Sequence, residues 1–294
     1  MRRARLTGIL VSTLMATAVA GPSASSAPAA LQPVDLELVL ATDNSQSVDR
    51  TEARLQREGV AAAFRHPEVV RAIQSGSLGR IAVAYLDWSS VPYTKLTLDW
   101  RILSDKASAD AFADALMKAP PAFGRGTAIG EALLIAARMI ETNNFQGTQR
   151  SIDVSGDGPN NTGPAVYEVR DQLVAKGISI NGLPVVSTGD FGTGEWGIYY
   201  GELENYYVNC VIGGPRSFAI AAKGFEEFAA AIRRKLVLEI SDAGMTPPPI
   251  VKVAASPNSL PPPNPLRPPP NANHGGPDQC GGYGRPQRFR FGNF

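Results

Sequence analysis

The sequence predicts an α/β fold: a doubly wound, mostly parallel open sheet with one antiparallel edge strand and helices on both faces. Two observations predict it. Short apolar runs bounded by turn residues alternate with amphipathic stretches through the middle of the chain, and such alternation favours a parallel sheet covered on both sides. One pair of runs is joined by a loop too short for a helical crossover, which indicates an antiparallel hairpin.

The expected strands are short and mostly apolar. They cover residues 34–43, 80–88, 95–101, 151–155, 178–186 and 206–212. In the third of these, Leu96, Leu98 and Trp100 alternate with polar residues, so we expect one solvated face and a place at the edge of the sheet. Ligands of such sheets bind at the carboxyl ends of the strands, where the strand order reverses.

Helices are expected where apolar residues recur three and four positions apart. Three stretches show such a stripe: Ile129, Leu133, Ala136 and Ile140; Val166, Val169 and Leu173; and Phe218, Ala222, Phe225, Ala229, Ile232 and Leu236. Each lies after or between expected strands, as the crossovers of a parallel sheet should.

The two ends of the chain differ from its middle. Residues 1–20 have a basic start, an apolar stretch and small residues, which is typical of a signal peptide. We expect a linker over 21–33, one domain over 34–245 and a disordered Pro- and Gly-rich tail over 246–294. The protein is therefore expected to be exported, periplasmic or secreted, with no transmembrane segment in the mature chain.

Charge excludes some partners. Lys and Arg total 28 against 27 for Asp and Glu, a net charge of +1. No bulk field then attracts nucleic acid or an anionic membrane, so no nucleic-acid partner is expected. Specificity has to come from a local site.

The two cysteines, Cys210 and Cys280, allow two interpretations. In an oxidising compartment they can form a disulfide. The alternative is one buried thiol and one free thiol in the tail. His66 and His274 are far apart in the sequence, so no Cys and His cluster of the zinc type is expected.

Oxygen-bearing side chains gather where the first expected strand ends. Asp43, Ser45 and Ser47 occupy alternate positions there, Thr127 opens a helix, and Asp157 follows a later strand. Two carboxylates and three hydroxyls suit a hard dication, Mg²⁺ or Mn²⁺. Each piece also has a simpler interpretation: Ser47 and Thr127 as helix caps, and Asp157 as part of a turn.

These motifs carry a family resemblance. The D-N-S-Q-S motif at 43–47, the G-T pair at 126–127 and the D-G pair at 157–158 resemble the metal-ion-dependent adhesion site (MIDAS) of von Willebrand factor type A (vWA) domains. More closely, the chain resembles exported bacterial vWA-like proteins catalogued as a domain of unknown function. The resemblance covers about residues 34–240.

The resemblance implies a role for each site residue. Ser45 and Ser47 would bind the metal directly, Thr127 directly or through water, and Asp43 and Asp157 largely through water. A coordination position then stays open for an Asp or Glu carboxylate of a partner protein. The implied function is a metal-dependent adhesion or adaptor module and not an enzyme.

Two alternatives remain: a Mg²⁺-dependent phosphohydrolase, or a degenerate vWA module with a structural role. A phosphohydrolase needs an Asp where Ser45 stands and a Lys near Asp157. The segments Asp87–Trp88 and Asp190–Trp196 are expected at the rim of the site. Asp153, inside an apolar strand, is expected to pair with Arg150 or a backbone group.

Overall fold

The structure, a computed structural model, describes residues 30–186, 202–241 and 280 of the 294-residue chain. The expected signal peptide, the expected rim segment 190–196 and the expected tail apart from Cys280 lie outside the described residues. So does the expected linker up to residue 29.

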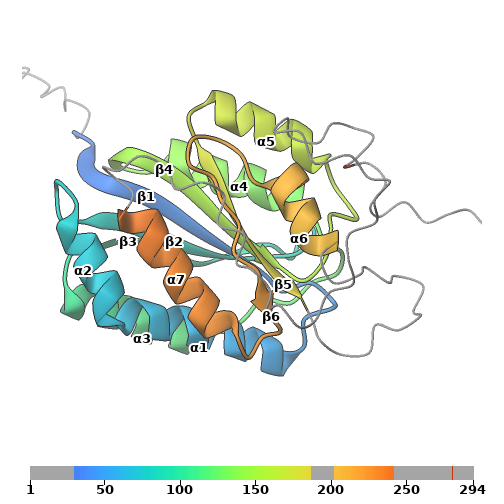
Figure 1. The fold of residues 1–294 in the computed structure, drawn as a ribbon, viewed down its shortest axis with the longest axis horizontal. Coiled ribbons are helices and arrows are strands. Elements are labelled where there is room, and N and C mark those ends of the chain that lie inside the picture. Colours follow the sequence, from blue (N-terminus) through green and yellow to red (C-terminus); the bar gives the residue numbers. More distant parts are fainter. Residues whose placement is uncertain (1–29, 187–201, 242–279, 281–294) are drawn as a thin grey trace, which may run out of the picture. The chain divides into compact units, whose positions relative to one another are not determined.

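The described residues form one six-stranded sheet in the order β3-β2-β1-β4-β5-β6 (Figure 1). The strands are β1 (Gln32–Asp43), β2 (Ile81–Trp88), β3 (Lys95–Leu103), β4 (Phe145–Gly156), β5 (Ser179–Val186) and β6 (Ala222–Lys223). β1 pairs in parallel with both β2 and β4, and β3 pairs antiparallel with β2 at the edge. The predicted fold class, including its antiparallel edge strand, is confirmed.

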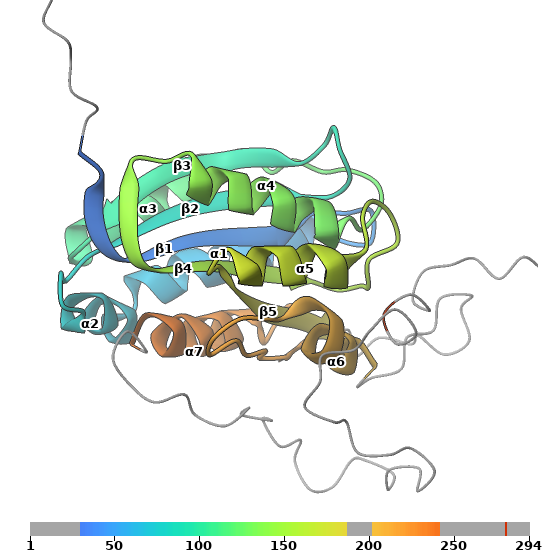
Figure 2. The same ribbon diagram turned by 90° about the horizontal axis from the view of Figure 1, so that it is seen from above.

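Helices cover both faces of the sheet (Figures 1 and 2). One layer holds α1 (Arg50–Arg65), α2 (Pro67–Ser75), α3 (Lys106–Lys118) and α7 (Phe228–Ser241); the other holds α4 (Ile129–Glu141), α5 (Val166–Ala175), α6 (Glu202–Tyr206) and the π-helix η1 (Tyr207–Val211). Alternate residues of β1 serve the two layers: Leu38 packs with the first, and Val39 with the second. Central strands therefore read as continuous apolar runs.

Two expectations after β5 are wrong. Tyr206 ends α6 and residues 207–211 form the π-helix η1, where a strand over 206–212 was expected. The last helix begins at Phe228, not near Phe218, because the segment before it runs along β5. There Gly182 N donates to Phe218 O over 3.0 Å, and Ile220 N donates to Gly182 O over 3.0 Å. Backbone hydrogen bonds to β5 therefore replace the helix that the apolar spacing predicted for this segment.

A buried ionic cluster fastens α7 to the sheet. Lys235 Nζ lies 2.7 Å from Asp153 Oδ2 and 3.3 Å from Glu239 Oε2, and Lys235 has no exposed side-chain area. Burial raises the pKa of Asp153 to about 7, and the Lys235 ammonium lowers it. The expected pairing of Asp153 with Arg150 is wrong, since Arg150 instead donates to the backbone carbonyl of Lys176.

Cys210 in η1 is joined to Cys280 by a disulfide that links positions 70 residues apart. A search of the described residues for a helix long and apolar enough to cross a bilayer finds none.

Candidate metal centre

The five expected ligands lie at one edge of the sheet. Asp43 is the last residue of β1, and Asp157 directly follows β4. Ser45 and Ser47 lie in the loop between β1 and α1, and Thr127 lies two residues before α4. Because β1 and β4 are parallel neighbours, their carboxyl ends meet.

Short contacts join these side chains. Ser47 Oγ donates to Asp157 Oδ1 over 2.8 Å, and the Oγ atoms of Ser45 and Ser47 are 3.2 Å apart. The backbone N–H of Ser45 donates to Asp43 Oδ1 over 2.7 Å. Thr127 lies near the residue after Asp157: its Oγ1 is 4.0 Å from the point that a Cβ on Gly158 would occupy.

Neither Ser47 nor Thr127 caps a helix. Asp49 caps α1 by accepting from the backbone N–H groups of Thr51 and Glu52, and the Glu52 carboxylate accepts from Asp49 N over 2.8 Å. α4 has Ala128 at its N-cap position and no side-chain cap. The simpler interpretation of the two hydroxyls therefore does not explain their positions.

Asp43 differs from other buried carboxylates of the sheet. It is fully buried, and its Oδ2 has no hydrogen-bond partner among the described residues. Burial, then the nearby charge of Asp157, raises its pKa well above the usual value. Asp87 and Asp153, also buried, each contact a cation: Arg57 Nη2 at 2.5 Å and Lys235 Nζ at 2.7 Å respectively.

A buried carboxylate is costly unless a positive charge or hydrogen bonds compensate it. Among the described residues no Lys or Arg forms an ion pair with Asp43 or Asp157. Burial also raises the pKa of Asp157. The arrangement fits a bound cation in the position that a basic side chain takes at Asp87 and Asp153.

Gly156 makes room for Asp43. A Cβ at this position would lie 2.8 Å from Asp43 Oδ2, 2.9 Å from Tyr207 Oη and 3.1 Å from Trp88 Cζ2. The Tyr207 hydroxyl and Trp88 Nε1 are also buried without a hydrogen-bond partner among the described residues. The absence of a side chain at Gly156 therefore lets Asp43, Tyr207 and Trp88 approach one another at the end of β4.

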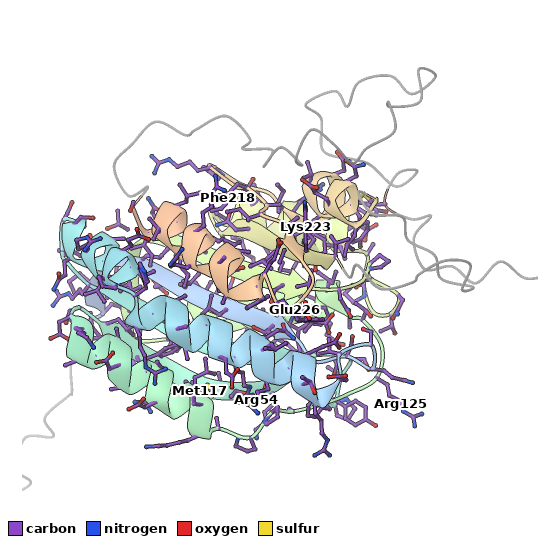
Figure 3. All side chains as sticks on the ribbon, turned by 60° about the horizontal axis from the view of Figure 1, so that its bottom comes forward. Arg54, Met117, Arg125, Phe218, Lys223 and Glu226 are labelled. Carbon is purple, nitrogen blue, oxygen red and sulfur yellow. A yellow bond between two sulfur atoms is a disulfide. The ribbon has the colours of Figure 1, made fainter. Side chains whose placement is uncertain are left out.

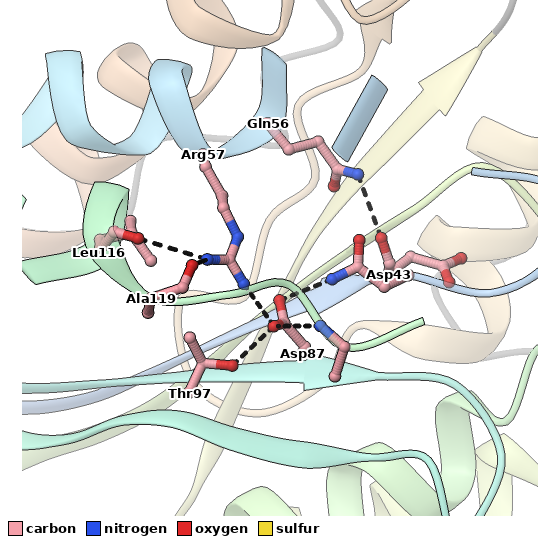
Figure 4. Close-up of polar contacts among 9 residues, drawn as sticks. Asp43, Gln56, Arg57, Asp87, Thr97, Leu116 and Ala119 are labelled. Carbon is pink, nitrogen blue, oxygen red and sulfur yellow. Dashed lines mark hydrogen bonds and ion pairs between the residues drawn. The ribbon is translucent and has the colours of Figure 1, made fainter. Parts of the chain in front are cut away.

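The segment Asp87–Trp88 is not at the rim of the site, contrary to expectation, because both residues are fully buried. Asp87 accepts from Arg57 Nη2 over 2.5 Å, Thr97 Oγ1 over 2.6 Å and Asn44 Nδ2 over 2.7 Å (Figure 4). Asn44 stands between Asp43 and Ser45 in the sequence. Asp87 therefore positions the loop that carries the first half of the site.

Two more side chains fix the backbone around the site. Asn161 Oδ1 accepts from Thr127 N over 2.8 Å, and Asn161 Nδ2 donates to Thr127 Oγ1 over 3.3 Å. Gln56 Nε2 donates to Asp43 O over 3.1 Å (Figure 4). Neither residue was predicted to support the site, nor were Asn44, Arg57 and Tyr207; the Asn pair after Asp157-Gly158 was the one local signal available.

The donor set limits the ion. Among the described residues there is no group of three or more His, Cys, Asp or Glu side chains suited to a metal, so thiolate and imidazole chemistry is not offered there. Two carboxylates with three hydroxyls fit a hard dication that retains water, such as Mg²⁺. They fit a structural zinc site poorly.

Solved structures of low sequence identity are similar to this one. The pilus adhesin SpaC from Lactobacillus rhamnosus GG aligns with a TM-score of 0.50 and 13% identity, over 72% of this chain and 31% of that chain. Proximal thread matrix protein 1 from the mussel byssus, with a zinc-occupied MIDAS motif, aligns with a TM-score of 0.48 and 18% identity, over 70% of this chain and 46% of that chain.

A von Willebrand factor type A structure from Catenulispora acidiphila aligns with a TM-score of 0.48 and 13% identity, over 70% of this chain and 43% of that chain. The chain spans less than half the length of these structures. At such identities the likeness concerns the fold alone. No curated protein matches the sequence.

The family comparison covers most of the chain. Residues 33–244 match the family described as "Protein of unknown function (DUF1194)". This range includes β1 from its second residue, the other strands, the helices from α1 to α7 and all five residues of the candidate metal centre. The chain therefore belongs to the DUF1194 family.

Proposed function

We propose that this protein is an exported, metal-dependent protein-binding module, an adhesion or adaptor domain, that engages an Asp or Glu carboxylate of a partner through Mg²⁺ or Mn²⁺. One observation carries the proposal: Asp43 is a buried carboxylate whose Oδ2 has no hydrogen-bond partner, and which contacts no Lys or Arg, within the described ranges of the chain. Its Oδ1 accepts from the backbone N–H of Ser45, and the Ser45 and Ser47 hydroxyls lie in contact with each other and lead to a second carboxylate, Asp157.

Each residue has a defined task in this proposal. Ser45 and Ser47 hold the ion through their hydroxyls, Thr127 directly or through water, and Asp43 and Asp157 largely through water. When bound, the ion supplies an electrophilic centre for one further carboxylate oxygen. Ser47 is exposed and Asp157 is half-buried, so this side of the site is the one that a partner can reach.

A binding role is supported over a catalytic one by the residues around the ion. Ser45 stands where a phosphohydrolase needs its second Asp, and Lys235 contacts Asp153 instead of Asp157. The fold is also shared with a pilus adhesin, SpaC. We therefore propose no catalytic residue.

Metal binding is tested by thermal and chemical denaturation of the purified protein with Mg²⁺, Mn²⁺ or Zn²⁺. Occupancy at a hundredfold excess over the dissociation constant should add about 2.7 kcal/mol to the free energy of unfolding. Asp43→Asn should abolish this gain, yet be at least as stable as the wild type without metal, because the substitution removes an uncompensated buried charge.

The matched control is Asp35→Asn. Asp35 lies near the other end of β1 and is buried, but it accepts from the backbone N–H groups of Leu78 and Arg80. This variant should lose stability with and without metal and keep the full metal-induced gain. A metal-induced gain that persists in Asp43→Asn would refute the proposed site.

A further inference from the structure

Beside the candidate metal centre lies an open groove of about 430 Å³. Its lining residues are Ser45, Gln46, Val48, Tyr93, Phe123, Gly124 and Arg125. Ser45 belongs to both the groove and the candidate centre, so a chain bound at the metal would continue into the groove.

Backbone contacts hold the walls of the groove in place. Gly124 N donates to Asn44 O over 3.1 Å, and Ser90 N donates to Arg125 O over 3.1 Å. A Cβ on Gly124 would lie 2.0 Å from Ser89 Oγ and 2.4 Å from Tyr93 Cβ, so only glycine allows this approach. The loops 89–94 and 120–126 are thus locked together, and a ligand finds the groove already formed.

The side chains at the groove combine apolar surface with a positive charge. Tyr93 is 47% exposed and Phe123 is 37% exposed, although both are large hydrophobic residues. Arg125 is exposed, and its guanidinium forms no hydrogen bond or ion pair within the described part of the chain. Figure 3 shows Arg125 pointing away from the ribbon.

We propose that this groove selects the partner: it binds an acidic segment in which an aromatic or large aliphatic residue lies between two carboxylates. One carboxylate reaches the metal, the apolar side chain packs on Tyr93 and Phe123, and the second carboxylate pairs with Arg125. This inference rests on the proposed function. Charge complementarity with Arg125 and the two exposed rings favour this occupant over a basic or purely polar one.

The test uses three fluorescein-labelled, amidated peptides built on the sequences Asp-Phe-Glu, Asp-Phe-Gln and Asp-Ser-Glu, each flanked by glycines. Fluorescence anisotropy measures their binding to the full chain in Mg²⁺ and in a chelator. The wild type should bind Asp-Phe-Glu about two- to fivefold more tightly than Asp-Phe-Gln, as expected for one partly exposed ion pair. It should also prefer Asp-Phe-Glu to Asp-Ser-Glu.

Variants assign these preferences to residues. Arg125→Gln should remove the preference for Glu over Gln and keep the preference for Phe over Ser, whereas Phe123→Ser should do the reverse. The matched control is Arg138→Gln, an exposed arginine near the far end of α4. It should keep both preferences, because it does not line the groove.

The outcomes separate this inference from the proposed function. Two outcomes would refute the proposed role of the groove without contradicting the proposed metal centre. One is equal Mg²⁺-dependent binding of all three peptides; the other is no binding at millimolar peptide while Mg²⁺ still stabilises the protein. Absence of any stabilisation by metal would overturn the proposed function itself, and the inference with it. Binding to phosphatidylglycerol vesicles that Arg125→Gln abolishes, without peptide discrimination, would overturn the inference in favour of a lipid surface.

Discussion

The substitution Gly156→Ala should displace Asp43 in the candidate metal centre, because the added methyl group has no room. The added Cβ would meet three buried groups at 2.8, 2.9 and 3.1 Å, where ordinary contacts lie at 3.4–4 Å. Asp43, Tyr207 and Trp88 are all fully buried, so none can swing into solvent to relieve the clash. Overpacking of this kind costs about 1–3 kcal/mol, from which the reduced freedom of the unfolded chain subtracts about 0.4–1 kcal/mol.

We therefore expect Gly156→Ala to lower the free energy of unfolding by about 1–2 kcal/mol in equilibrium guanidinium denaturation. It should also shrink the Mg²⁺-induced rise in melting temperature, because Asp43 is displaced. Gly158→Ala, two residues on, is the matched control: a Cβ there meets only Thr127 Oγ1, at 4.0 Å. That variant should be neutral or slightly stabilised. Equal stability of the two variants, with an unchanged response to Mg²⁺, would refute this reasoning.

Three further predictions concern the supporting structure. Arg57→Met should cost about 3–5 kcal/mol because Asp87 becomes an unpaired buried charge; adding Asp87→Asn should recover part of this loss, and a cost under about 1 kcal/mol would contradict the assigned role. The pKa of Asp153 is about 7 in the folded protein against an ordinary value of 3.8, so the folded state binds the proton of this carboxyl more tightly than the unfolded state does. The resulting contribution to the free energy of unfolding is fully present below about pH 4 and is lost as the pH rises through about 7. Lys235→Met should therefore destabilise the protein more at about pH 8 than at about pH 5 in urea denaturation, and the opposite order would refute the pairing. Cys280→Ser should lower stability by about 2–4 kcal/mol, and dithiothreitol should have the same effect on the wild type but none on the variant.

Local sequence patterns were sufficient for most of the sheet and the helices around it. The short connection between β2 and β3 indicated the antiparallel edge, and the stripe from Ile129 to Ile140 became α4. The strand predicted from the run YYVNCVI was wrong because a short apolar run has no periodicity that separates a strand from a buried helical segment. Tyr207 enters the core as part of a π-helix, beside the space left by Gly182.

The polar partners of buried charges could not be predicted from local patterns. Asp153 forms an ion pair with Lys235 on the last helix, and Asp87 forms one with Arg57 on the first helix, so each pair joins elements that are distant in the sequence. The oxygen motif itself was visible because its spacing is local around Asp43. Its supports were not, because they depend on the packing of α1 and β2 against β1.

The disulfide between Cys210 and Cys280 determines how a pulling force would enter the domain. The covalent ring that it closes contains α7, which spans Phe228–Ser241. Tension applied to the chain beyond Cys280 is therefore delivered to η1 at Cys210, and α7 is bypassed instead of being peeled from the sheet. The loading point lies three residues from Tyr207, whose hydroxyl borders Asp43 at Gly156. If the domain binds a partner at this edge, as proposed, mechanical load would be transmitted next to the binding site while α7 stays packed on the sheet.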